Sequence, residues 1–438
     1  MPLFRHMTAL DVRTLLALVC AMTTACGAAE TSVCVDCGDD APAPIVGRLE
    51  GDVALAVGPS DAVWFAGHDV DFGALVVGRL TIDAAGETQL IEPVRVDDGS
   101  PPSRRVGERP SLAVDSTGEP RVAYLDAEAG QAFLARRRGA WTVEPLDGPG
   151  LRSAEDTPGA SVAGDDELSP FVTQVALALD AGGGEHVATL DSTTGTLRII
   201  SSTGACRNPA AAIPAAGTAL LALEPRVVDA AVLEGAGVVP SRIGGVPSIT
   251  VDVTGAIAVT FYLESTGDLA LLTCAGESLT IRTIAGSDEE RDLGDVGYWS
   301  SVAVDPRSGK LAIAFFDRTR GQLAYATSVK GEKAVVVIDD GAGELGAFSR
   351  YVGQMPSLSF APLGSGAPGR PTVAYFDASE HVVRLATRDD FGRWSHEALA
   401  DAEPLQGRLA AASVASGTWV AFARLGEPHV VMDTRDAE

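Results

Sequence analysis

Residues 110–115 read Pro-Ser-Leu-Ala-Val-Asp, and after a turn that contains Gly118, residues 120–126 read Pro-Arg-Val-Ala-Tyr-Leu-Asp. Near-copies of the first stretch begin at Pro247, Ser300 and Pro356, and each is followed by a second apolar run that ends at or just before a carboxylate. A unit that recurs along a chain is the sequence signature of a repeat architecture. The fold is therefore decided by this unit.

The unit contains four predicted strands. In the copy that begins at Ser111 they cover residues 111–114, 121–125, 132–136 and 141–146, and the short connections between them contain Gly, Asp, Ser or Arg. Short apolar runs bounded by such turns are typical of β-strands. No long helical periodicity interrupts them, so the predicted fold class is all-β.

Four strands joined by hairpins form the pattern of a propeller blade. The units predict a single β-propeller domain over residues 45–438, with seven four-stranded blades; six or eight blades stay open because the first and third units match least well. In the third unit we expect the fourth strand at residues 219–223. The last unit supplies three strands, and residues 45–49 are expected to close the ring as its fourth, which would remove two exposed strand edges.

The N-terminus is predicted to carry an export signal. Residues 1–25 are predicted to be a signal peptide, since the apolar run at 14–25 is too short to span a bilayer. Residues 26–44 are small, polar and Pro-containing, and we expect a flexible tether there.

The signal ends in Thr23-Thr24-Ala25-Cys26-Gly27, which resembles the lipobox of bacterial lipoproteins. The resemblance implies that Cys26 is lipidated and anchors the protein to the bacterial outer membrane or cell surface; Thr23 departs from the aliphatic residue usual in that family. The alternative is an ordinary secretory signal and a periplasmic or extracellular protein. Both predict export.

The acidic composition restricts the partners. The formal net charge is −26 and the pI is about 4.5. Nucleic-acid binding is excluded, because it requires clustered Lys and Arg. We expect a monomer that contacts membrane only through the N-terminal lipid.

The cysteines predict disulfides. Cys34 and Cys37 form a Cys-x-x-Cys pair in the tether, but no second pair stands at zinc-site spacing, so a disulfide is favoured over metal or redox chemistry. Cys206 and Cys274 lie in neighbouring units, and a second disulfide between them is an open possibility. No metal and no cofactor is predicted.

The repeats resemble those of exported bacterial propeller proteins of unassigned activity, with the form Pro-Ser-Leu-Ala-Val-Asp, turn, Pro-x-Val-Ala-Tyr-x-Asp. The resemblance covers most of residues 100–425 and implies the fold but no activity. Sialidase-like propellers are the enzymatic relatives to consider, yet their Ser-x-Asp-x-Gly-x-x-Trp turn is not found in the sequence.

Two sets of polar residues fall near the ends of the second strands. Carboxylates there could gather cations, but the glycine that follows most of them favours turn formation: Asp69, Asp71, Asp126, Asp191, Glu264, Asp317 and Asp377. Of six histidines, His68, His381 and His429 fall on the same face. They lack metal-site spacing, and we interpret them as structural.

The irregular positions of the repeat are the candidate site. After the glycine of Val106-Gly107, Val296-Gly297 and Val352-Gly353, two residues differ from copy to copy: Glu108 and Arg109, Tyr298 and Trp299, Gln354 and Met355. They enter the innermost strand at the mouth of the central channel. Varied side chains on a constant frame are typical of a binding site, although free drift of loop positions is an equal alternative.

These observations predict a non-catalytic, cell-envelope-anchored binding or scaffold propeller. Its partner would be a protein, peptide or glycan at the channel mouth, where Tyr298, Trp299 and Tyr351 could stack on a sugar or peptide. The alternative is a carbohydrate-active propeller enzyme, a glycoside hydrolase or polysaccharide lyase. No catalytic residue is assigned from the sequence.

Overall fold

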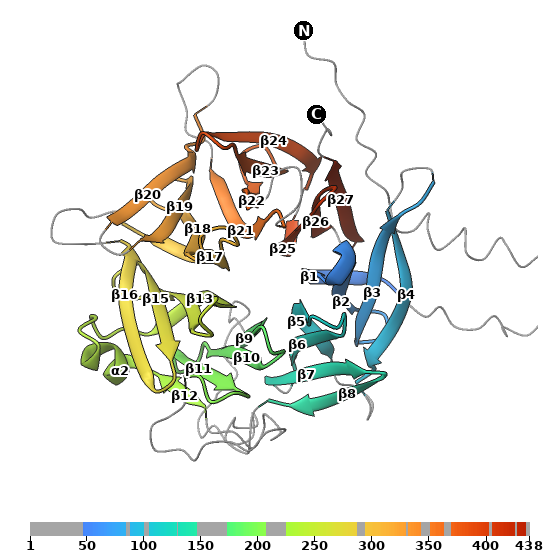
Figure 1. Cartoon of the computed structure of the whole chain (residues 1–438), viewed down its shortest axis with the longest axis horizontal. Coiled ribbons are helices and arrows are strands. Elements are labelled where there is room, and N and C mark those ends of the chain that lie inside the picture. The colour runs from blue at the N-terminus through green and yellow to red at the C-terminus, as the bar shows by residue number, and fades with distance from the viewer. Residues whose placement is uncertain are drawn as a thin grey trace, which may run out of the picture.

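The computed structural model describes residues 47–84, 88–99, 105–128, 130–146, 173–206, 225–286, 294–329, 332–342, 351–362, 369–402, 405–424 and 427–434. Strands radiate in sheets from a common centre, so the chain forms a β-propeller (Figure 1). The predicted signal peptide and the tether, with Cys26, Cys34 and Cys37, lie outside the described residues. Within the described part, no helix is long and apolar enough to cross a membrane.

The strands follow one another in antiparallel order within each sheet. The first sheets contain β1 (Leu49–Val57), β2 (Val63–Asp69), β3 (Ala74–Ile82) and β4 (Thr88–Asp97); β5 (Val106–Val114), β6 (Pro120–Asp126), β7 (Gln131–Arg138) and β8 (Ala140–Pro145); β9 (Thr173–Leu179), β10 (Glu185–Asp191), β11 (Thr196–Ser201) and β12 (Arg226–Val228). A short 3-10 turn, η1 (Pro59–Asp61), lies between β1 and β2.

An eight-stranded sheet comes next, in which two four-stranded units are joined by one parallel bridge between Val246 and Trp299. These units are β13 (Ile243–Val251), β14 (Ile257–Leu263), β15 (Asp268–Ala275) and β16 (Ser278–Ala285); β17 (Val296–Val304), β18 (Leu311–Asp317), β19 (Gln322–Val329) and β20 (Glu332–Asp339). The last sheets are β21 (Val352–Phe360), β22 (Pro371–Asp377), β23 (Val382–Arg388) and β24 (Trp394–Asp401); β25 (Leu405–Val414), β26 (Gly417–Arg424) and β27 (Glu427–Thr434).

Burial explains the recurring composition of the second strands. Every residue of β2, β6, β14, β18 and β22 is buried, because the faces of each second strand pack against the two neighbouring sheets. Bulky residues such as Tyr124 and Tyr375 fill this space. Their hydroxyl groups donate hydrogen bonds to Asp97 and Asp339, each at 2.6 Å. In these two units the tyrosine therefore joins one sheet to the preceding one.

The serine of the Pro-Ser stretch joins neighbouring innermost strands. Ser111 Oγ in β5 accepts a hydrogen bond from the Leu177 N–H of β9 at 2.9 Å. The same bond recurs further around the ring at 2.9 to 3.1 Å, with these acceptor and donor residues: Ser248 and Val302, Ser301 and Leu358, Ser357 and Ala411. The regularity of the unit is thus a requirement of side-by-side packing around the central channel.

The ring closes by side-chain packing between the first and last sheets, which lie side by side in Figure 1. Leu49 belongs to β1 and pairs with Asp69 of β2, so the prediction that residues 45–49 form a fourth strand beside β27 is wrong for this residue. Among the described residues, β27 pairs only with β26. Apolar residues of β1 and β2, including Phe65, instead pack against Trp419 of β26.

The fourth strand of the third sheet also differs from the prediction. It is β12 (Arg226–Val228), which pairs with β11, whereas residues 219–223 lie outside the described ranges. A one-and-a-half-turn helix, α2 (Ala230–Gly235), follows directly and is capped by the Asp229 carboxylate, which accepts from Ala231 and Val232. A strand of only three residues suffices as the fourth strand, because Val228 inserts into the buried cluster between the third and fourth sheets.

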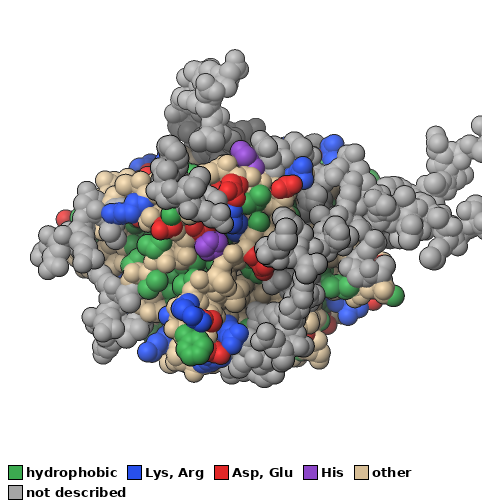
Figure 2. Space-filling model, turned by 90° about the horizontal axis from the view of Figure 1, so that it is seen from above, with side chains coloured by type: hydrophobic (Ala, Val, Ile, Leu, Met, Phe, Trp, Pro, Cys, Tyr) green, Lys and Arg blue, Asp and Glu red, His purple; other side chains and the backbone are tan. Residues whose placement is uncertain are grey.

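Figure 2 views the rim of the propeller. Lys and Arg side chains are interspersed there with Asp and Glu, and apolar and histidine side chains lie between them. Several opposite charges are paired, as in the contact of the Arg393 guanidinium with Asp389 at 2.8 Å. Such exposed pairs contribute little to stability.

Candidate functional site

A β-bulge lifts the variable residues out of the innermost strands. The pairing of β5 with β6 shifts register between Val106 and Ser111, the segment that holds Glu108 and Arg109. The same shift occurs in the other innermost strands with the exception of β9: β1, β13, β17, β21 and β25. Residues in a bulge leave the ladder, and so their side chains can be aimed at a site.

Gly107 starts the bulge and cannot be replaced without strain. Its φ is +91°, and a Cβ atom there would lie 2.6 Å from Leu75 Cα in β3 of the preceding sheet. Gly353 has the same relation to Leu323, with a φ of +97° and a distance of 2.7 Å. The Val106 N–H also donates to the Gly73 carbonyl at 3.1 Å. The glycine of the repeat therefore lets each innermost strand approach the preceding sheet.

The central channel holds a cavity of about 180 Å³, which is lined by residues of the innermost strands β1, β5, β9, β13, β17, β21 and β25. Two of the predicted site residues, Trp299 and Met355, line it. Arg408 of β25 lines it as well. Its guanidinium pairs with the Asp52 carboxylate at 3.1 Å, and its backbone N–H donates to the same carboxylate at 2.6 Å.

Aromatic side chains form one side of the mouth. Tyr298 and Trp299 meet edge to face with ring centroids 5.1 Å apart, and Trp299 lies 5.7 Å from Phe316. Phe316 in turn contacts Tyr351 at 5.0 Å. We name these four residues the aromatic row. Tyr298 and Tyr351 are exposed, so the row presents ring edges and faces to solvent.

Tyr262 extends the aromatic row at its base. Its ring lies 5.6 Å from Tyr298, and its hydroxyl donates to Asp295 at 3.0 Å. Asp295 also pairs with the exposed Arg318 guanidinium at 3.1 Å. Burial, reinforced by the bond to Asp295, raises the pKa of Tyr262 to about 12. This hydroxyl therefore stays protonated and anchors the row.

Charged side chains form the other side of the mouth. A cavity of about 210 Å³ lies between β1, β2 and β5, and six polar residues line it: Glu50, Asp52, His68, Arg105, Glu108 and Arg109. We name it the side cavity. The carboxylate of Glu108 pairs with Arg105 at 2.8 Å. Both variable residues of β5 therefore belong to this cavity.

Arg109 interacts with both sides of the mouth, the aromatic row and the side cavity. Burial lowers the pKa of its guanidinium, and the positive charge of Arg408 acts in the same direction, while Asp52, Glu108 and the Tyr298 hydroxyl oppose the shift. These groups come from β1, β5, β17 and β25, so they converge on one region of the mouth. A partly buried guanidinium of this kind is suited to bind an anion.

His68 is the most buried ionisable group of the side cavity, at 3 % exposure. Its Nδ1 lies 2.7 Å from the Val106 carbonyl oxygen. A carbonyl oxygen only accepts, so Nδ1 carries the proton and Nε2 holds the lone pair. Nε2 has no hydrogen-bond partner among the described residues. Burial lowers the pKa of the imidazole, so the ring is neutral near pH 7.

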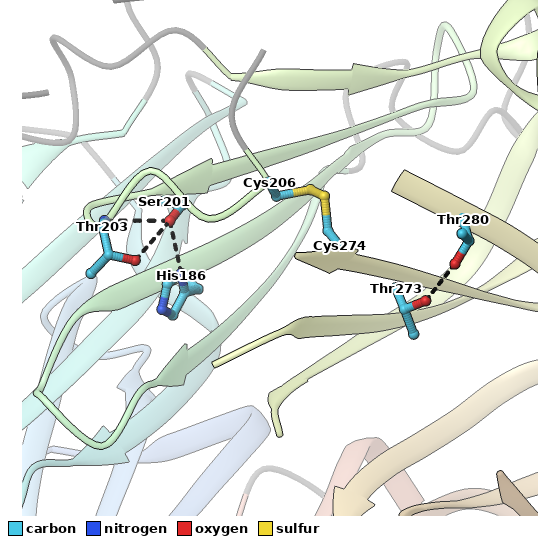
Figure 3. Close-up of a disulfide and its surroundings, with 7 residues drawn as sticks. All are labelled: His186, Ser201, Thr203, Cys206, Thr273, Cys274 and Thr280. Carbon is cyan, nitrogen blue, oxygen red and sulfur yellow. Dashed lines mark hydrogen bonds between the residues drawn. A yellow bond between two sulfur atoms is a disulfide. The ribbon is translucent and has the colours of Figure 1, made fainter. Parts of the chain in front are cut away.

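His186, the other buried histidine, shows the contrasting arrangement. Its Nδ1 lies 3.0 Å from Ser201 Oγ (Figure 3), and its Nε2 lies 3.3 Å from the Asp180 carboxylate. Both ring nitrogens are engaged, which is the pattern of a structural histidine. The sequence interpretation of the histidines as structural fits His186 and does not explain His68.

The structure divides the six predicted residues into groups. Glu108 and Arg109 lie in the side cavity, and Trp299 and Met355 line the central cavity, with Tyr298 beside Trp299. Gln354 pairs with Phe376 in the ladder and lines neither cavity.

Sequence reasoning missed Asp52, His68 and Arg408. The first and last sheets lack the full repeat, which concealed Asp52 and Arg408. A signal was present nonetheless, because each follows a glycine, Gly51 or Gly407, as Glu108 follows Gly107.

The carboxylates near the ends of the second strands serve mainly in turns. Asp126, Asp191 and Asp377 each accept backbone N–H groups two or three residues further on. Asp69 accepts from Asp71 and Phe72. Across the described ranges, no group of three metal-ligating side chains is found.

Cys206 and Cys274, the pair left open by the sequence, form a disulfide (Figure 3). It joins the end of β11 to β15, and both cysteines are buried. The bond thus fastens the third sheet to the fourth, at the point where the chain makes its insertion before β12.

No family model matches the sequence, and no curated protein matches it. Solved structures resemble it in fold. An ancestral GH74 enzyme superposes with a TM-score of 0.50 at 10% identity over 89% of this chain and 48% of its own. The Hadza microbial sialidase Hz136 gives 0.48 at 12% identity over 86% and 74%. The periplasmic gluconolactonase PpgL of Pseudomonas aeruginosa gives 0.44 at 14% identity over 79% and 84%.

The likeness to the GH74 enzyme supports the fold described above, that of a β-propeller, and the chain spans about half of that enzyme. The prediction that this fold serves a non-catalytic binding or scaffold protein is corrected, because the GH74 structure shows the same fold in an enzyme. The prediction erred because it took the absence of a known catalytic motif in the sequence as absence of catalysis.

Proposed function

We propose that this protein is a carbohydrate-active enzyme, a glycoside hydrolase or polysaccharide lyase, that acts at the mouth of the central channel of a seven-bladed propeller. The observation that carries the proposal is the meeting of two surfaces at the mouth. The aromatic row offers faces on which sugar rings stack, and Arg109, which interacts with Tyr298, links it to the side cavity.

The side cavity supplies the groups that glycan cleavage requires. Carboxylates, guanidinium groups and a neutral imidazole lie around one space of about 210 Å³. Proton transfer by such positioned side chains accelerates bond cleavage by about 10²–10⁴-fold. A site built from a stacking platform and an acid-base pocket matches a sugar polymer that extends across the mouth.

Export is part of the proposal. A buried disulfide is typical of proteins that fold in an oxidising compartment, which supports a location outside the cytoplasm. We infer that Cys26 carries a lipid. Replacement by Cys26→Ser should release the protein from the membrane fraction, and an unchanged distribution would refute lipidation while leaving export open.

The activity is tested by incubating the full chain with a panel of neutral and acidic polysaccharides and measuring new reducing ends. We expect cleavage of at least one polymer and a loss of about 10-fold or more in kcat/KM for Tyr298→Ala, because stacking on an aromatic ring is lost. Phe391→Ala is the matched control, since Phe391 is 85 % exposed in the turn between β23 and β24, at the opposite end of the strands. Absence of cleavage across the panel would refute the enzyme proposal.

A further inference from the structure

A separate polar cavity lies at the other end of the strands, away from the channel mouth. It has a volume of about 400 Å³ and lies where three turns of neighbouring sheets meet: β17 to β18, β21 to β22 and β23 to β24. We name it the distal cavity. It shares no lining residue with the central cavity or the side cavity, so the proposed cleavage at the mouth does not explain it.

Tyr325 of β19 lines the distal cavity and departs from the pattern of the third strands. In each four-stranded sheet, the equivalent residue stands three positions after the one that pairs with the last residue of the second strand. In the other sheets it is aliphatic and buried: Val77, Leu134, Ile199, Leu271 and Leu385. Tyr325 is buried as well, at 4 % exposure. Packing alone therefore favours an aliphatic side chain here, and the tyrosine adds a hydroxyl group.

This hydroxyl has no hydrogen-bond partner in the described part of the chain. Buried tyrosines usually find one, as Tyr375 does in Asp339. Some unpartnered atoms are closed off from solvent, but the Tyr325 hydroxyl is not one of them, so it is open to the cavity that Tyr325 lines. Burial raises the pKa of Tyr325 to about 12. The hydroxyl therefore stays protonated near neutral pH and can donate a hydrogen bond to a ligand.

Two cationic side chains line the distal cavity and form no ion pair within the described ranges, Lys310 and Arg388. Lys310 is exposed in the turn between β17 and β18. Arg388 ends β23 and lies over the Tyr325 ring, with its guanidinium carbon 6.0 Å from the ring centroid. Its Nε donates to the Gly392 carbonyl at 3.2 Å, which leaves the terminal N–H groups to bind a ligand.

The carboxylates that line the same cavity are already engaged. Asp390 pairs with Arg370 at 2.5 Å, and Asp389 pairs with Arg393 at 2.8 Å. Asp305 accepts an N–H and a hydroxyl of its own turn at 2.8 and 2.6 Å. The distal cavity is therefore left with two unpaired positive charges in a chain whose formal net charge is −26. This charge favours an anionic ligand.

We propose that the distal cavity binds a tetrahedral oxyanion, a sulfate or phosphate group, with Lys310, Arg388 and the Tyr325 hydroxyl as its donors. Two positive charges match a doubly charged group, and its several oxygens can accept from all three donors at once. Arginine binds such a group through two N–H groups and lysine as a point charge. This inference does not depend on the proposed cleavage at the mouth.

The size of the cavity indicates how the group is carried. Pockets for small molecules measure about 300–1,000 Å³, and the distal cavity, at about 400 Å³, is within that range. A single ion would leave much of this space empty. We therefore expect the sulfate or phosphate to be an ester on a small molecule such as a sugar.

Calorimetric titration of the full chain at constant ionic strength tests the site. The ligands are inorganic sulfate, inorganic phosphate, glucose 6-sulfate and glucose 6-phosphate, with acetate as the carboxylate control. We expect saturable binding of at least one tetrahedral anion, about 10-fold or more tighter than acetate, and tighter binding of an ester than of its free ion. No saturable binding of any of the four up to about 10 mM would overturn the proposal. Acetate that binds as tightly as they do would overturn the tetrahedral assignment.

Charge variants locate the site. Lys310→Gln and Arg388→Gln should each raise the Kd by about 10-fold, because a charged hydrogen bond is lost. Arg138→Gln is the matched control, an exposed arginine at the corresponding turn of the second sheet, between β7 and β8. An equal loss of affinity in Arg138→Gln would show a general effect of charge and overturn the site, as would parent-like affinity in both cavity variants.

Two tyrosine variants separate binding from packing. Tyr325→Phe keeps the ring and removes only the hydroxyl, so the melting temperature without ligand should be unchanged or higher while the Kd rises about 5-fold. Tyr375→Phe removes the donor to Asp339 at 2.6 Å and should lower the melting temperature without changing the Kd. A lower melting temperature and an unchanged Kd in Tyr325→Phe would overturn the role of its hydroxyl in binding.

Discussion

The innermost strands β5 and β17 are two copies of one frame that carry opposite chemistry. Both begin with Val-Gly, both bulge at the same place, and both use a serine, Ser111 or Ser301, to bond the following strand. In the bulge, however, β5 carries Glu108 and Arg109, while β17 carries Tyr298 and Trp299. The shared glycine and serine of the strand and the two residues in its bulge can therefore be changed independently of each other.

The largest effect is expected from the bulge glycines. Gly107→Ala would place Cβ 2.6 Å from Leu75 Cα, whereas Gly297→Ala would meet the Leu269 side chain at 2.5 Å. Both residues have positive φ, which costs a substituted residue about 1–2 kcal/mol. Because Leu75 Cα and Leu269 Cβ are both fixed in place by the backbone, each variant should lose about 3 kcal/mol or more in the free energy of unfolding.

Urea denaturation followed by circular dichroism measures both losses. Clearly unequal losses would show that the two bulges are not constrained alike. A parent-like midpoint for Gly107→Ala would contradict the close approach of β5 to β3.

A smaller and equal effect is expected from the serines. Ser111→Ala and Ser301→Ala each remove the acceptor of one backbone N–H, Leu177 at 2.9 Å and Leu358 at 3.0 Å. Each should cost about 1 kcal/mol, the net value of a typical hydrogen bond. The same denaturation assay checks it. A much larger loss in one of them would show that the frame differs between β5 and β17.

The smallest effect concerns pH. His68 has a lowered pKa in the folded state, so the unfolded chain binds a proton that the folded chain does not, from about pH 6.5 down to the folded pKa. Stability should therefore decrease as the pH falls through this window, and His68→Asn should weaken the dependence. His186, whose pKa is also lowered by burial, acts in the same direction. Phe316 stands at the equivalent position beside β17 and contributes none. An unchanged pH dependence in His68→Asn would count against a neutral, buried imidazole.

Many of the strands and turns were predictable from the sequence, because the residue patterns that produce them are local. The strand predicted at residues 121–125 is β6 (Pro120–Asp126), one residue longer at each end, since an apolar run and its flanking turns define it. The carboxylates near the second-strand ends were predicted to form turns, and Asp126 and Asp377 accept the backbone N–H groups that such turns require. Residues 45–49 were misplaced because the choice between extending β1 and pairing with β27 depends on a contact between chain ends.

The sequence by itself determined the all-β fold, the repeated unit and the positions where the unit stops dictating residue identity. Strand periodicity and turn-forming residues act over a few positions, so both can be recognised in a single sequence. Only the tertiary structure brought Asp52, His68, Arg109, Tyr298 and Arg408 to one mouth, because they come from sheets far apart in the sequence that meet around the central channel. The neutral, Nδ1-protonated form of His68 was likewise decided by burial and by one hydrogen bond to Val106. Neither can be recognised from a local sequence pattern.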